Sequence, residues 1–122
     1  MEIDLFDKNG YAVAYIVYDN DEVHTIFTWD GYAVCYIIGE MVYGWNGQHI
    51  GWFINGILYN LQGYRVGFLR EKCPSAPHAP RAKSAKHAKN AKAAKHAHHA
   101  KPSLSCNVAD ELLLDLLMQG AR

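Results

Sequence analysis

The sequence predicts an all-β domain over residues 2–71, built from four β-hairpin repeats (about eight strands) around a pseudo-fourfold axis. Three observations support this fold class. Glycines recur at nearly constant spacing, strand-forming residues flank each of them, and a small residue follows each one at the same distance. A basic segment at 74–102, expected to be disordered, and a short amphipathic helix at 105–120 follow this domain.

The repeat is centred on Gly10, Gly31, Gly47 and Gly63, which are 21, 16 and 16 residues apart. An Asn, Asp or Gln precedes each glycine, and such dipeptides supply the positive φ that a tight hairpin turn needs. Each unit also has an aromatic residue four positions before its glycine, a Val or Ile three after it and another aromatic five after it. Each unit is therefore predicted to be a strand, a turn and a second strand.

Side chains alternate along the strand that follows each glycine. Bulky residues such as Tyr15 and Tyr36 share one face, and the other face begins with small residues. We expect the bulky face to form the core. The small positions would let neighbouring backbones approach closely around the axis; they are Ala14, Cys35, Gly51 and Gly67.

The repeated pattern resembles the 4-fold beta flower domain, a small bacterial all-β domain. Each of the four units has, in order, an aromatic residue, an Asn/Asp/Gln-Gly dipeptide, a Val or Ile, a small residue and a second aromatic residue. The resemblance covers residues 2–71. It implies a fold and no established activity, so it carries over no catalytic residue and no cofactor.

Charge is distributed unevenly along a chain whose net charge is zero. Residues 1–73 carry a net −5, residues 74–102 a net +7 and residues 103–122 a net −2. The three cysteines form no CxxC pair, which favours a reducing compartment and a cytoplasmic location. The acidic start of the chain does not resemble a signal peptide, and no apolar run predicts a membrane-spanning helix.

No residue pattern predicts catalysis, a metal site or a cofactor. The acidic turn at 18–24 lacks the spacing of a calcium-binding loop, and His24 and His49 have no third ligand nearby in the pattern. Nucleophile and phosphate-binding motifs are absent from the sequence. The expectation is a protein that is not an enzyme.

Two tryptophans occupy equivalent positions, two residues before a turn glycine. Trp29 and Trp45 would form an aromatic platform for a small molecule or partner if this end of the domain is exposed. The alternative is that both rings cap the core, and the sequence leaves the choice open.

The basic segment places alanine and lysine with a period of three residues. It contains no large apolar residue, so it has no face to bury, and we expect it to be disordered. Dense positive charge of this kind suits nonspecific contacts with the phosphates of nucleic acid, a solvated linker being the alternative. The candidate polyanion-binding residues are Lys83, Lys86, Lys89, Lys92, Lys95 and Lys101.

Residues 105–120 carry the signals of a helix, with Asn107 as the expected N-cap and Gly120 as the stop. A helix this short must dock on the β-domain, on a second copy of the chain or in a partner's groove. The long tether before it slightly favours the last two. The candidate partner-binding residues are Val108, Leu112, Leu113, Leu116 and Leu117.

These features together predict a protein-interaction or adaptor module that engages a protein partner, or itself, through the C-terminal helix. The alternative is a nucleic-acid-associated protein that binds phosphates through the lysine-rich segment. No membrane partner is expected.

Overall fold

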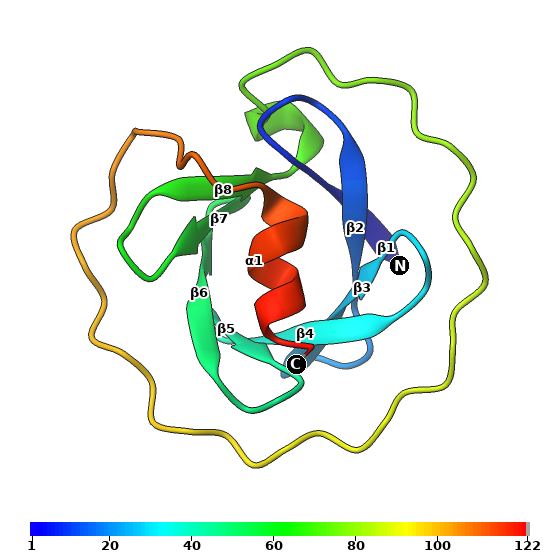
Figure 1. Cartoon of the computed structure of the whole chain (residues 1–122), viewed down its shortest axis with the longest axis vertical. Helices are drawn as coiled ribbons and strands as arrows, with labels where there is room; N and C mark the ends of the chain where they lie inside the picture. Colours follow the sequence, from blue (N-terminus) through cyan, green and yellow to red (C-terminus); the bar gives the residue numbers. More distant parts are fainter. Residues whose placement is uncertain (122) are drawn as a thin grey trace.

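A computed structural model describes residues 1–121 and shows a closed antiparallel barrel of eight strands in sequence order (Figure 1). A 3-10 turn, η1 (Arg70–Lys72), and one helix, α1 (Leu113–Gln119), follow the barrel. The strands are β1 (Glu2–Phe6), β2 (Ala12–Val17), β3 (Val23–Thr28), β4 (Ala33–Ile38), β5 (Met41–Gly44), β6 (His49–Ile54), β7 (Ile57–Asn60) and β8 (Arg65–Phe68).

The four predicted hairpins are confirmed as β1–β2, β3–β4, β5–β6 and β7–β8. Each turn closes with a bond from the glycine N–H to the carbonyl three residues earlier, and each turn glycine has φ between 86° and 94°. Every hairpin also has a register shift at the same place, just before its turn. Pairing of β1 with β8 through Phe6 and Phe68 closes the ring.

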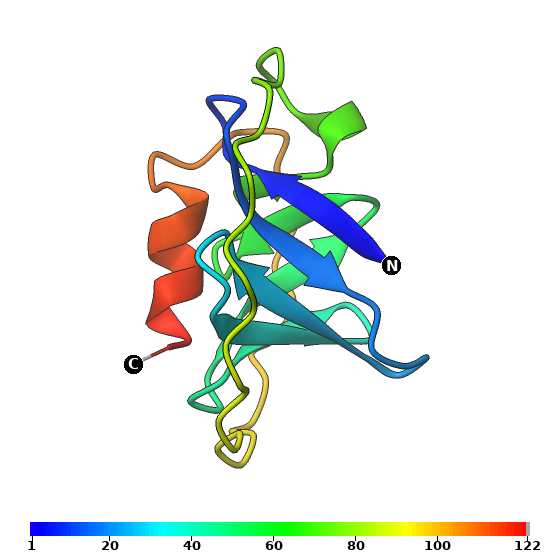
Figure 2. The ribbon, with the colours of Figure 1, turned by 90° about the vertical axis from the view of Figure 1, so that its right-hand side faces the viewer.

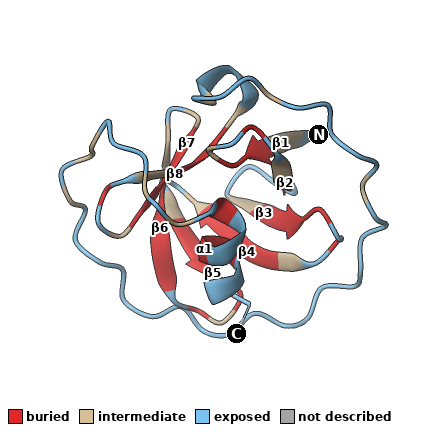
Figure 3. Ribbon diagram, turned by 45° about the horizontal axis from the view of Figure 1, so that its top comes forward, coloured by how far each residue is buried: buried red, intermediate tan, exposed pale blue. Residues whose placement is uncertain are grey.

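The barrel interior is aliphatic, and the bulky aromatic face is its outside, so the expected assignment of faces is wrong. Ile16, Ile37 and Leu58 belong to the central core, whereas Tyr15 and Tyr36 belong to separate aromatic clusters. Those outer rings are nevertheless buried. Figure 3 shows that much of the strand ribbon belongs to buried residues. An aromatic outer face requires a second layer to cover it.

Part of that second layer is the segment that was expected to be disordered. Residues 74–105, called the strap from here on, run without helix or strand around the outside of the barrel (Figures 1 and 2). Backbone hydrogen bonds attach the strap to all four hairpin turns. The strap has no apolar face of its own to bury, and the barrel surface of the same chain supplies its contacts.

Helix α1 lies across one mouth of the barrel (Figures 1 and 2) and contacts the second strand of every hairpin, β2, β4, β6 and β8. Leu113, Leu116 and Leu117 are buried in the central core. The small positions make room for the helix as well as for the strands. A Cβ on Gly67 would meet the Leu113 side chain at 2.8 Å, and Cys35 Sγ donates to the Leu117 carbonyl at 3.4 Å.

The helix is shorter than predicted and Asn107 is not its N-cap. The residues just before Leu113 form bends and one bridge instead of a helix, since Val108 bridges Arg65 and the backbone of Asn107 and Ala109 bonds to Arg65. The helix instead starts after Leu112, which has extended φ and ψ and makes no side-chain cap. Pairing with β8 thus takes the backbone groups that a longer helix would have used.

Candidate functional site

The strap is attached to the barrel with a period of nine residues. The N–H groups of His78, His87, His96 and Ser105 donate to the carbonyls of the four turn glycines, at 2.8–2.9 Å. One nine-residue step of the strap therefore spans one hairpin of the barrel. The three-residue alanine and lysine period concealed this longer one, which the histidines at 78, 87 and 96 mark in the sequence.

Aromatic stacking adds to the attachment in the first two units. The Tyr11 ring stacks on His78 with centroids 4.2 Å apart, and the Tyr32 ring stacks on His87 at 4.0 Å. The third unit has Gln48 where the tyrosine would be, next to the glycine that binds His96. The stack is therefore a feature of two units only.

The two tryptophans do not form an exposed platform. Trp29 and Trp45 are 4% and 8% exposed, and their Nε1–H groups donate to the strap carbonyls of Arg81 and Asn90. These carbonyls are again nine residues apart. The indoles are covered because the strap crosses them, so their role is to bind the strap.

Four of the six candidate polyanion-binding lysines form ion pairs with the acidic barrel. Lys83 pairs with Glu2 at 2.9 Å and Asp4 at 3.2 Å, and Lys86 pairs with Glu2 at 2.7 Å. Lys89 pairs with Asp19, and Lys101 pairs with Glu40 at 3.4 Å. The opposite charges of the two segments thus meet within one molecule.

These pairs shift the pKa values of the groups involved. Hydrogen bonds from Lys86 and Lys83 hold the pKa of Glu2 below its ordinary value. Bonding to Glu2 raises the pKa of Lys86. Burial acts against the charge of Lys83, but its bonds to Glu2 and Asp4 outweigh this and raise its pKa. Both lysines therefore stay charged at neutral pH.

Lys92 and Lys95 differ from the other strap lysines because no carboxylate of residues 1–121 lies within ion-pair distance of them. Their ammonium groups lie over aromatic rings instead. Lys92 Nζ is 4.3 Å from the Tyr36 centroid, and Lys95 Nζ is 5.4 Å from that of Tyr43. Both lysines are exposed, so their charge is available to solvent.

His49 is a buried histidine that binds the strap, and both of its ring nitrogens are occupied. Nδ1 accepts from the His99 N–H at 2.8 Å, so Nε2 carries the proton and donates to the Gly51 carbonyl at 2.8 Å. Burial lowers the pKa of His49, and the neighbouring His98 and His99 add to the effect. This neutral imidazole has no lone pair left for a metal.

The barrel mouth carries an apolar groove beside α1. A cavity of about 540 Å³ lies between the helix, the β3–β4 turn and the strap. Its apolar wall includes Leu114 and Met118, which are 40% and 37% exposed, and the half-exposed ring of Tyr32. Leu114 and Met118 belong to the face of α1 that points away from the core.

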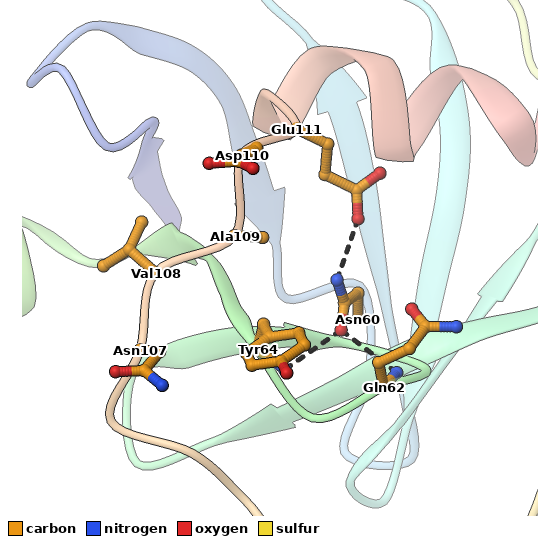
Figure 4. A pocket seen from close by; sticks show the side chains of 8 residues that line it. All are labelled: Asn60, Gln62, Tyr64, Asn107, Val108, Ala109, Asp110 and Glu111. Atoms are coloured by element: carbon orange, nitrogen blue, oxygen red, sulfur yellow. Dashed lines mark hydrogen bonds between the residues drawn. The ribbon is translucent and has the colours of Figure 1, made fainter.

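A second cavity, of about 460 Å³, lies where the chain approaches α1 beside the β7–β8 turn (Figure 4). Asn60 is already satisfied there, since its Oδ1 accepts from the Gln62 and Tyr64 N–H groups and its Nδ2 donates to Glu111. The carboxylate of Glu111 therefore supports the loop. This polar hollow brings no nucleophile and base together.

The five predicted partner-binding residues are divided by the fold. Leu113, Leu116 and Leu117 face into the barrel, and only Val108 and Leu112 keep an exposed part, 38% each. Leu114 and Met118 were missed because a helix taken alone does not reveal which arc docks. No group of three or more metal-ligating side chains gathers within residues 1–121, and no helix in that range has the length and apolar character to cross a membrane.

A comparison with family models matches residues 3–111, described as "4-fold beta flower protein". The match extends 43 residues beyond the last hairpin strand, β8, and includes the whole strap. Comparisons with curated proteins and with solved structures find no match. The repeat, the closed barrel and this match together show that the chain belongs to the 4-fold beta flower family.

Proposed function

We propose that this chain is a non-enzymatic protein-interaction module that binds a partner at the barrel mouth. The observation that carries the proposal is the apolar groove beside α1, with Leu114, Met118 and Tyr32 exposed along it. Large apolar side chains gathered beside a hollow are typical of protein-docking surfaces.

In this interaction the helix uses its outer side. Its Leu113, Leu116 and Leu117 side is committed to the barrel core, so a partner that required it would have to extract the helix. A partner that uses the outer side leaves the fold intact. Rigid presentation on the barrel also lowers the ordering cost that a tethered helix would carry into binding.

The test is an interaction capture with the full chain and two charge-introducing variants. Leu114→Glu places a carboxylate in the groove, and Val108→Glu places one on an equally exposed aliphatic residue outside it. We expect Leu114→Glu to lose the captured partner and Val108→Glu to keep it. Retention of the same partner by both variants would contradict the proposal.

A second candidate function is nonspecific binding of nucleic acid by the strap, favoured by the exposed Lys92 and Lys95, which have no ion-pair partner within the described residues. The test is DNA binding by the full chain as a function of salt. Replacing both lysines by glutamine should reduce the slope of log K against log salt by about 2, since each phosphate contact contributes about 0.9.

The matched control is Lys83→Gln/Lys86→Gln, which removes the same charge from lysines that the barrel already neutralises. We expect a smaller effect there. Absence of DNA binding at low salt would eliminate this second candidate and leave the first unaffected.

A further inference from the structure

The outer face of the barrel holds two lysine side chains in nearly identical aromatic corners. The first cage is formed by Tyr15 and Trp29, whose rings are 5.9 Å apart and at 86°; the second is formed by Tyr36 and Trp45, 6.0 Å apart and at 86°. Perpendicular rings of this kind present their electron-rich faces to one cation.

Each cage is occupied by a strap lysine. Lys83 Nζ lies 4.3 Å from the Tyr15 centroid and 5.1 Å from that of Trp29. Lys92 Nζ lies 4.3 Å from the Tyr36 centroid and 5.4 Å from that of Trp45. The two lysines are nine residues apart, which is also the step with which the strap attaches to successive hairpins.

A third cage is absent because the repeat changes. In the next unit the tryptophan position is Leu61, and its lysine, Lys101, pairs with Glu40 instead. Both cages also lie beside a main-chain site, since the Trp29 and Trp45 carbonyls accept from Ser84 and Ala93 N–H groups. The barrel thus binds an extended backbone through main-chain hydrogen bonds and binds two ammonium groups, nine residues apart, in its aromatic cages.

We propose that this surface is a binding site for an extended, lysine- and alanine-rich segment of another polypeptide, and that the strap is its occupant in cis. Charge complementarity supports the occupant: Glu2, Asp4 and Asp19 border the first cage and pair with strap lysines. The strap has no secondary structure of its own, and its backbone bonds to the turns repeat every nine residues, so a chain with the same spacing satisfies the same groups.

The two cages differ in the cation they accept. In the first, the ammonium donates to Glu2 and lies within ion-pair distance of Asp4, so N–H groups are required. The second cage places no carboxylate of residues 1–121 within ion-pair distance of Lys92. It therefore accepts a trimethylated lysine, which keeps the charge and loses the donors.

The experiment uses the full chain and a fluorescein-labelled peptide with the sequence of residues 76–105. In Lys83→Gln/Lys92→Gln the cages are intact but the strap lacks the two charges that fill them. We expect this variant to bind the peptide at least about tenfold more tightly than the wild-type chain, whose own strap competes at high effective concentration. Binding is measured by fluorescence anisotropy.

A matched peptide with one intervening alanine deleted sets the lysines eight residues apart with nearly unchanged composition. It should bind at least about tenfold more weakly, because only one cage is then filled. Equal binding of the two peptides, or no binding by the variant, would overturn the proposal. A Lys86→Gln chain gives a second acceptor, since it removes a strap ion pair with Glu2 while the barrel surface and both caged lysines are kept.

Trimethylation separates the two cages. A peptide trimethylated at the position of Lys92 should bind as well as the unmodified one, and a peptide trimethylated at the position of Lys83 about tenfold more weakly. The opposite order would contradict the assignment. The groove beside α1 shares Trp45 and the strap residue Asn90 with this surface, but Leu114→Glu changes neither cage, so failure here and failure of the proposed function are distinguishable.

Discussion

Substitution of a turn glycine separates backbone strain from contact with the strap. Gly31 has φ of 94°, and an added methyl group would collide with the carbonyl oxygen of Ala85 in the strap. Gly39 also has positive φ, 60°, but a methyl group there would meet no atom within 4 Å. Gly39→Ala is therefore the control for Gly31→Ala.

The expected magnitudes follow from these contacts. Gly39→Ala should lower the free energy of unfolding by about 1–2 kcal/mol, the cost of a left-handed alanine. Gly31→Ala carries a similar backbone cost. It also displaces the strap and so weakens two contacts. The hydrogen bond from His87 N–H to the Gly31 carbonyl contributes about 1 kcal/mol to stability, and the stack of Tyr32 on His87 contributes about 0.5–1.5 kcal/mol.

The assay is urea unfolding of both variants, followed by tryptophan fluorescence. We expect Gly31→Ala to lose about 3 kcal/mol and Gly39→Ala less than about 2 kcal/mol. Tryptic cleavage after the strap lysines under native conditions should accelerate in Gly31→Ala only. Equal losses of stability with equal cleavage rates would refute the claim that the turn glycines bind the strap.

Three further predictions follow from the same contacts. Gln48→Tyr should raise the free energy of unfolding by about 0.5–1 kcal/mol, because the new ring can stack on His96 as Tyr11 stacks on His78 and Tyr32 on His87. An unchanged midpoint in thermal denaturation would show that this stack does not form. Leu117→Ala should lower the free energy of unfolding by about 2–5 kcal/mol because its side chain fills the barrel core. Leu114→Ala, at an exposed position, should lower it by less than about 0.5 kcal/mol. Similar urea midpoints for the two variants would show that α1 does not dock on the barrel. Burial depresses the pKa of His49 in the folded chain. The free energy of unfolding should therefore be highest above the ordinary histidine pKa of 6.5 and should fall as the pH drops below it. In a His49→Gln chain, the free energy of unfolding should change less between pH 7 and pH 5.

Local sequence rules were sufficient for the hairpins. An Asn-Gly, Asp-Gly or Gln-Gly dipeptide between strand-forming residues favours a tight turn by short-range sterics, and single hairpins are marginal in water, so the four units must pack on one another. The assignment of faces failed for a physical reason. Both faces of the strands are buried, one by aliphatic side chains and α1 and the other by the strap, so alternation of bulky and small residues does not indicate which is inside.

The strap could not be predicted from its own composition, because its stability comes from another surface. Its alanines have no face to bury, but the Trp29 and Trp45 indoles and the turn carbonyls supply partners at every ninth residue. The complementary net charges of residues 1–73 and 74–102 were visible in the sequence and pointed to this contact.

Amide hydrogen exchange along the strap tests most directly the claim that the strap is an integral layer of the fold. The amides of His78, His87, His96 and Ser105 donate to the four turn carbonyls, whereas the intervening amide of Lys86 has no such acceptor among the turn and loop bonds. We predict slowed exchange at the four donors in a nine-residue pattern, with rates near those of an unfolded peptide at Lys86. Uniformly unprotected exchange from residue 74 to residue 105 would contradict it.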